Sequence, residues 1–147
     1  MRRPLVARPP SSDGAWQYFF ASRERELLGS NHRQRGLIAL GAIRGEVNNG
    51  GFDQFLCNDS GHLAPDAAAA AHEAGEPDLA RIITSAFSRL GEPFPTDRGE
   101  RLAILACVAE DEFDTLDLEY YALERTIDLD SVMDAYVWQH ADDFFDR

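Results

Sequence analysis

Apolar residues recur at the spacing of an α-helix in nearly every long segment of this chain. The run that keeps the 3.6-residue period most closely is Leu79, Ile82, Ile83, Ala86, Phe87 and Leu90. No alternation of apolar and polar residues extends over the length of a strand. The pattern predicts an all-α fold, a single compact domain of about seven or eight helices. A chain of 147 residues can bury such a core without disulfides or metal.

Capping residues and glycines indicate where the first helices begin and end. Residues 11–13 can cap a helix that runs to about residue 28. Asn31 followed by Gln34 has the form of a capping box for a second helix. We expect that helix to end at residues 48–51, where two asparagines precede two glycines, and a short helix to follow over residues 52–57.

Similar signals divide the second half of the chain. Asp97 followed by Glu100 is a second capping-box pattern, and it predicts the start of a long helix with an apolar stripe that includes Leu102 and Leu105. Residues 130–131 should cap the last helix.

Nothing in the sequence argues for a second domain. Without an internal repeat or linker, we expect a flexible lead-in over residues 1–10 and one helical domain over residues 11–147. No apolar run is long enough to cross a bilayer, so no membrane association is expected. Cys57 and Cys107 lie in apolar helical patterns and predict buried, reduced thiols. These features favour a cytoplasmic protein.

Charge is distributed very unevenly along the chain. The formal net charge is −12, and every cationic side chain is an arginine. Residues 1–50 carry eight arginines and four acidic residues, whereas residues 51–147 carry six arginines and 22 acidic residues. This balance argues against direct binding of nucleic acid and favours a basic protein partner.

The acidic residues are densest after residue 109. The residues that we expect to form a partner-binding acidic face are Glu110, Asp111, Asp114, Asp117, Glu119, Glu124, Asp128, Asp130 and Asp134. If this segment is helical, Glu110, Asp114 and Asp117 share one face. The ordinary alternative is a solvated surface that keeps the protein in solution. The arginines of the first third can neutralise part of the acidic half, within the fold or across a dimer.

The segment EVNNGGFDQFLCNDSG, residues 46–61, is the most distinctive motif in the chain. Its glycines permit a chain reversal, its asparagines can cap backbone groups, and its phenylalanines should pack inward. We therefore expect a mainly structural role for Asn48, Asn49, Gly50, Gly51, Phe52, Asp53, Gln54, Phe55, Asn58 and Gly61. The same polar side chains could instead line a small-molecule pocket.

This motif resembles the signature of a bacterial DNA-mimic protein family that was formerly a domain of unknown function. The likeness covers most of the chain from about residue 33 onward. It implies an all-helical, cytoplasmic and often dimeric protein with no known catalytic activity or cofactor. In the family's characterised member, an acidic surface imitates duplex DNA and occupies a transcription factor. The arginine-rich first third of this chain departs from that pattern.

Three functional hypotheses follow. The leading one is a non-enzymatic acidic protein that occupies the basic surface of a DNA-binding protein or transcription factor. The second is an immunity or antitoxin-like protein that blocks a toxin. The third is a small-molecule-binding domain or an unrecognised enzyme centred on residues 48–58. No catalytic residue, cofactor site or metal site can be named, because the four histidines lie far apart and no nucleophile has a nearby base.

Overall fold

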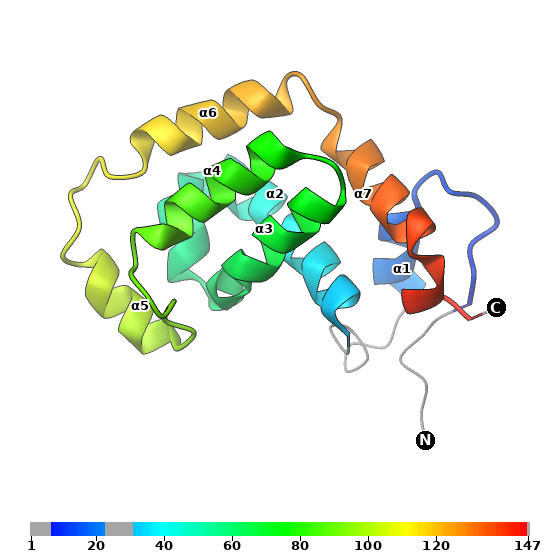
Figure 1. The fold of residues 1–147 in the computed structure, drawn as a ribbon, viewed down its shortest axis with the longest axis horizontal. Helices are drawn as coiled ribbons and strands as arrows, with labels where there is room; N and C mark the ends of the chain where they lie inside the picture. Colours follow the sequence, from blue (N-terminus) through cyan, green and yellow to red (C-terminus); the bar gives the residue numbers. More distant parts are fainter. Residues whose placement is uncertain (1–6, 23–30, 147) are drawn as a thin grey trace.

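The long helix α2, His32–Cys57, is the element around which most of the others pack. The computed structural model describes residues 7–22 and 31–146. Within them it contains seven α-helices, which confirms the all-α prediction (Figure 1). The other six are α1 Ala15–Ser22, α3 Ala64–Glu73, α4 Pro77–Ser88, α5 Arg98–Leu105, α6 Asp114–Glu124 and α7 Leu129–Gln139. Two short 3-10 helices, η2 Asp59–Leu63 and η3 Ala141–Asp143, complete the list.

The core lies between α2 and the helices that surround it. The predicted stripe on α2 is buried, including Leu40, Ile43 and Val47. Helix α3 packs on α2, α4 lies beside α3, and α6 crosses the outside of α4 (Figure 1). Helix α7 follows α6 and packs on α1. None of the helices in the described residues is long and apolar enough to cross a membrane.

Both predicted capping boxes lie at the N-termini of helices. The side chain of Asn31 accepts a hydrogen bond of 2.9 Å from the amide of Gln34, and Asp97 accepts one of 2.9 Å from the amide of Glu100. The Gln34 side chain is used differently from the second bond of a capping box, in which it would accept from the backbone amide of Asn31. It is fully buried and donates to the carbonyl of Asp143, so it joins the start of α2 to the end of the chain.

The cap predicted at residues 130–131 is wrong by two residues. Asp128 caps α7, because its carboxylate accepts from both the amide and the hydroxyl of Ser131, at 3.4 Å and 2.8 Å. Helix α7 therefore begins at Leu129, which is buried. Asp130 points elsewhere and pairs with Arg44 at 3.1 Å.

Two further predicted helices differ in length. Helix α1 begins at Ala15, two residues after the last of the caps predicted at residues 11–13, and residues 23–30 lie outside the described part of the chain. Helix α5 ends at Leu105 instead of being long. Its inward face carries Arg101 and Leu105, whereas Leu102 is exposed. Cys107, beyond this early helix end, is exposed and not buried as expected, while Cys57 is half-buried.

The predicted lead-in falls mostly on residues outside the described part. Residues 7–10 are described, and Arg8 within them contacts Asp142 and the ring of Trp138. The predicted domain boundary at residue 11 stays a prediction.

Candidate acidic interface

The motif of residues 46–61 bends α2 at its two central glycines. Gly50 and Gly51 have non-helical backbone angles, and Gly51 has φ 77° and ψ −176°. The chain resumes a helical path at Phe52, as expected. Phe52 and Phe55 are buried in the core, which confirms their inward orientation. Gly61 lies close against the last turns of α2, since a Cβ there would meet the carbonyl oxygen of Phe55.

Asp117 of α6 completes the bend from a distant part of the sequence. Its Oδ1 accepts a hydrogen bond of 2.8 Å from the amide of Phe52, the first amide of the resumed helix. Burial raises the pKa of the Asp117 carboxyl, the Phe52 amide opposes this, and the nearby Asp114 and Asp53 carboxylates raise it further. Asp117 therefore faces the motif.

The polar side chains of the motif bond to one another and to nearby groups. Gln54 and Asn58 both donate to the carboxylate of Glu46, at 2.7 Å and 2.6 Å. Asn48 donates to the carbonyl of Arg44 at 2.8 Å and to Glu124 at 3.2 Å. The amide nitrogen of Asn49 lies 3.4 Å from the side-chain oxygen of Gln54. These contacts are those of a structural element.

These side chains do not converge on a common cavity. Asp53 is exposed, and Asn48 and Gln54 point to different partners. The hollow nearest the motif has a volume of about 480 Å³ and is open to solvent. Its lining consists of Glu46, Asn58, Asp59, Ser60 and Arg98.

Arg101 is a structural residue that the sequence analysis missed. Its side chain is fully buried, with Nε donating to the carbonyl of Leu56 at 2.9 Å. Its two terminal nitrogens donate to the carbonyls of Thr96, at 2.8 Å, and Asn58, at 2.9 Å. Burial and the nearby Arg98 lower the pKa of this guanidinium. No sequence signal marks it, because an arginine next to an apolar stripe normally lies in solvent.

Several of the predicted acidic residues serve the fold. Asp134 accepts hydrogen bonds from the amides of Gly14, at 2.8 Å, and Trp16, at 3.1 Å, and so caps α1. Asp130 pairs with Arg44, and Glu119 pairs with Arg81 at 3.3 Å. Like Asp117, these residues form hydrogen bonds or ion pairs within the chain.

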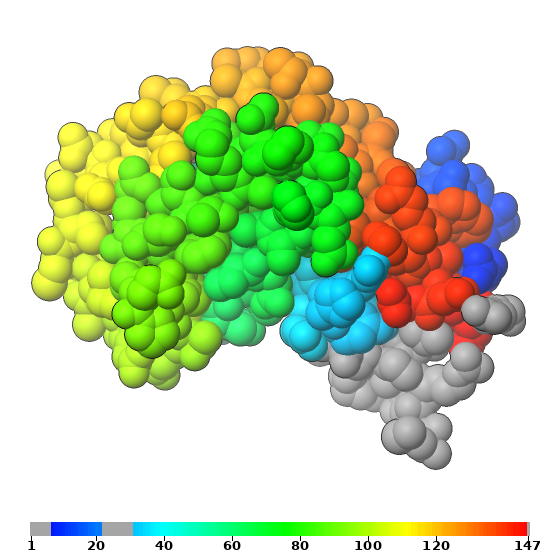
Figure 2. Space-filling view, viewed as in Figure 1, coloured from blue at the N-terminus to red at the C-terminus, as the bar shows by residue number. Residues whose placement is uncertain are grey.

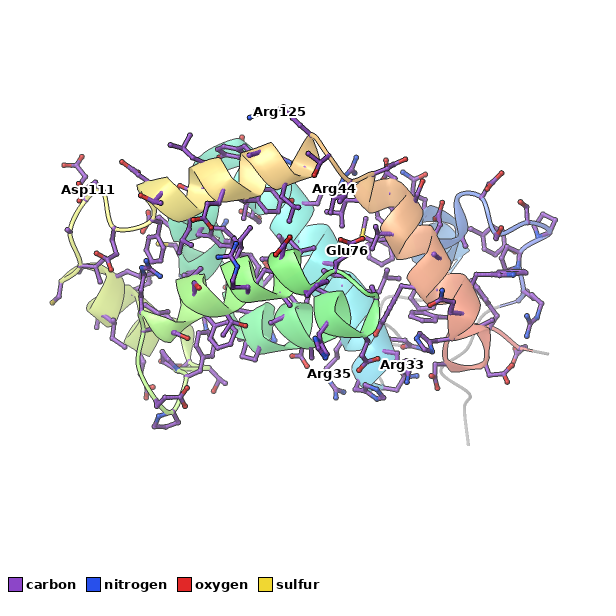
Figure 3. All side chains as sticks on the ribbon, turned by 45° about the horizontal axis from the view of Figure 1, so that its top comes forward. Arg33, Arg35, Arg44, Glu76, Asp111 and Arg125 are labelled. Atoms are coloured by element: carbon purple, nitrogen blue, oxygen red, sulfur yellow. The ribbon has the colours of Figure 1, made fainter. Side chains whose placement is uncertain are left out.

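The remaining predicted carboxylates have no ion pair among the described residues. They form what we call the α6 acidic surface: Glu110, Asp111, Asp114, Glu124 and Asp128. Glu110 and Asp111 lie in turns before α6, so Glu110 does not share a helical face with Asp114 and Asp117. Figure 3 shows Asp111 at one end of α6 and Arg125 at the other. Helix α6 itself lies along the outer edge of the molecule (Figure 2).

A protein-family model supports the resemblance seen in the motif. The model described as DMP19-like protein matches residues 30–140, which include α2 to α7 and the complete motif. The chain belongs to the DMP19-like family. Searches of curated proteins and of solved structures gave no match.

In this DMP19-like protein, Arg8 and Arg33 pair away from the α6 acidic surface, whereas Arg44 pairs with Asp130, two residues after Asp128 of that surface. Arg8 pairs with Asp142 at 3.3 Å. Arg33 lies 3.4 Å from Asp143 and 3.7 Å from Glu73. Figure 3 shows Arg33 and Arg35 at the start of α2, well away from Asp111. Around α6, Arg81 pairs with Glu119 and Arg89 pairs with Glu112, at 3.3 Å and 3.2 Å, so the negative charge of this region is compensated in part.

An exposed leucine accompanies the acidic residues of α6. Leu118 is 69% exposed, although it is a large apolar side chain. A shallow hollow of about 300 Å³ beside it is lined by Asp114, Asp117, Leu118 and Tyr121. Burial, followed by the charges of Asp117 and Glu124, raises the pKa of Tyr121. This part of α6 therefore combines negative charge with apolar area.

Proposed function

We propose that this protein binds a basic protein through the α6 acidic surface and occupies a surface that would otherwise bind DNA. The observation that carries the proposal is the group of carboxylates before, on and after α6 that have no ion pair among the described residues, although neighbouring carboxylates such as Glu112 and Glu119 are paired with arginines. Membership of the DMP19-like family supports a mimic of this type. The proposal includes no catalytic step.

The dimensions of α6 suit such a role. Asp114 and Glu124 are ten residues apart on α6, which is about 15 Å along a helix axis. Glu110 and Asp111 extend the charge before the helix, and Asp128 extends it beyond. A basic cleft that accepts DNA attracts carboxylates arranged over such a distance, and the complementary field raises the association rate. Leu118 adds an apolar contact that DNA lacks.

A matched pair of double variants tests the proposal. D111N/D114N removes two charges from the α6 acidic surface, and E92Q/E100Q removes two exposed charges from the connector and α5. Immobilised wild-type protein should retain a basic DNA-binding protein that moderate salt releases and duplex DNA displaces. We expect D111N/D114N to weaken binding by about three- to tenfold and E92Q/E100Q by less than about twofold.

Three outcomes would contradict the proposal: an acidic partner, binding that salt does not weaken, or equal losses in the two variants. A partner that is a toxin whose activity is blocked would favour the immunity hypothesis. A small-molecule role has less support, because Asn48 and Gln54 bond within the protein and do not line a common hollow. The dimer implied by the resemblance stays a prediction.

A further inference from the structure

Trp138 of α7 lines two separate hollows on the surface. Its side chain is partly exposed, although it is a large aromatic residue. The first hollow, of about 330 Å³, is lined by Trp138 and Gln139 together with Arg8 and Asp142, among others. The second, of about 370 Å³, also contains Trp138 and Gln139 in its lining. We call this second cavity the Trp138 hollow; its other lining residues are Ser12, Asp13, Ser131, Asp134 and Ala135.

The first hollow already contains a guanidinium group. The Cζ atom of Arg8 lies 5.8 Å from the centroid of the Trp138 ring. The Nη2 atom of Arg8 lies 3.3 Å from Oδ1 of Asp142. An aromatic face and a carboxylate are the two groups that bind a guanidinium best, because the flat cation stacks on the ring while its N–H groups reach the acid.

The Trp138 hollow offers the same two groups but contains no basic residue in its lining. Asp134 accepts hydrogen bonds from the neutral backbone amides of Gly14 and Trp16, and it has no ion pair within residues 7–22 and 31–146. The carboxylate of Asp13 is exposed and has no ion pair among the described residues. The hollow is therefore negative and partly apolar.

We propose that the Trp138 hollow binds an arginine side chain of a basic protein partner. This inference rests on the proposed function, because it names a side chain through which that partner is anchored. Arginine fits better than lysine, since its planar group stacks on the indole, is more weakly hydrated and binds carboxylates in a fork. Helix α7 follows α6 in the chain (Figure 1). Ser131, which lines the hollow, comes three residues after Asp128 of the α6 acidic surface. A partner along α6 thus approaches the hollow.

The test uses short peptides in place of the unidentified partner. The heptapeptide Gly-Ser-Gly-Arg-Gly-Ser-Gly is titrated into ¹⁵N-labelled protein, and the indole N–H signals of Trp138 and the buried Trp16 are followed by NMR. The W138F variant assigns the signals. We expect a saturable shift of the Trp138 signal and none of the Trp16 signal. The lysine peptide should bind about threefold more weakly or worse, and the neutral citrulline peptide should not bind measurably.

Two variants locate the bound arginine. D13N removes a carboxylate of the hollow and should weaken the arginine peptide by about threefold or more. E100Q on α5, a change of equal charge far along the chain, should leave affinity unchanged within about 1.5-fold. The proposal is overturned if the shift does not saturate, if the citrulline peptide produces it equally, or if D13N and E100Q behave alike.

The peptide measurement separates this inference from the proposed function. If the protein binds the arginine peptide as described but has no basic partner, the hollow remains a guanidinium site and the proposed function is refuted. A partner that binds along α6 with equal affinity for wild-type and D13N proteins overturns the anchoring role and leaves the proposed function intact.

Discussion

Gly51 has a backbone conformation, φ 77° and ψ −176°, that is essentially restricted to glycine. The space where its Cβ would lie is taken by the carboxylate of Asp117, which accepts the hydrogen bond of the Phe52 amide. Glycine at position 51 thus meets two requirements: it adopts this backbone conformation, and it leaves room for the Asp117 carboxylate. Asp117 lies on α6, 65 residues after Phe52.

The G51A variant should lower the free energy of unfolding by about 3 kcal/mol, from backbone strain and the displaced Asp117 hydrogen bond. Urea denaturation measures this directly. Gly45 is the matched control, because it lies in the same helix with nothing within 4 Å of its Cβ position. G45A should raise the free energy of unfolding by about 0.5–1 kcal/mol. Equal effects of the two substitutions would refute this explanation of the motif.

At the scale of secondary-structure elements, α6 is attached to α2 by two polar contacts over the bend. Asp117 bonds the Phe52 amide, and the hydroxyl of Tyr121 donates to the carbonyl of Val47 at 2.7 Å. One contact is made on each side of the glycine pair. The motif and α6 therefore hold each other in place, and the outer face of α6 depends on this attachment.

The D117N variant should show how the charge of Asp117 affects that attachment. Asparagine keeps an acceptor for the Phe52 amide and has no charge. Because the Asp117 pKa is raised in the folded protein, the folded state binds a proton before the unfolded state does as pH falls. The charge therefore lowers stability above the raised pKa, and this cost is lost as pH falls toward 3.8, the ordinary value.

Thermal unfolding of wild-type and D117N proteins between about pH 7 and pH 4 measures this effect. We expect D117N to be the more stable protein at neutral pH and the difference between the two to shrink with acidification. A difference that grows on acidification would mean that the carboxylate stabilises the fold in its charged form.

The helices and their caps could largely be predicted from the sequence, since capping and apolar periodicity are local. Asn31 and Asp97 cap as expected, and Phe52 and Phe55 are buried as expected. The roles of Asp117, Asp134 and Arg101 could not be predicted. Each bonds backbone groups brought close only by the tertiary fold, and a polar residue that points inward has the same local pattern as one that points outward. The acidic surface is smaller than expected for this reason.

At the scale of the whole molecule, the net charge of −12 opposes folding through mutual repulsion. The ion pairs of the described residues are largely exposed, and such pairs contribute only about 0–1 kcal/mol each. Added salt should therefore screen more repulsion than attraction.

We expect the melting temperature to rise by a few degrees, roughly 2–5 °C, between about 0.02 M and 0.3 M sodium chloride. Differential scanning calorimetry checks this. The D111N/D114N variant carries two fewer negative charges and should show a smaller rise than the wild-type protein. A melting temperature that falls with salt would show that the ion pairs outweigh the repulsion.

The α6 acidic surface, whose five carboxylates have no ion pair among the described residues, has a consequence before any contact is made. Negative charge that is unpaired in one region of the surface and paired with arginines elsewhere contributes to an electric dipole moment of the described part of the molecule. An approaching cationic body exerts a torque on such a dipole and turns α6 toward itself. Fewer collisions then occur in unproductive orientations, and the rate of productive encounter exceeds what the net charge alone would give.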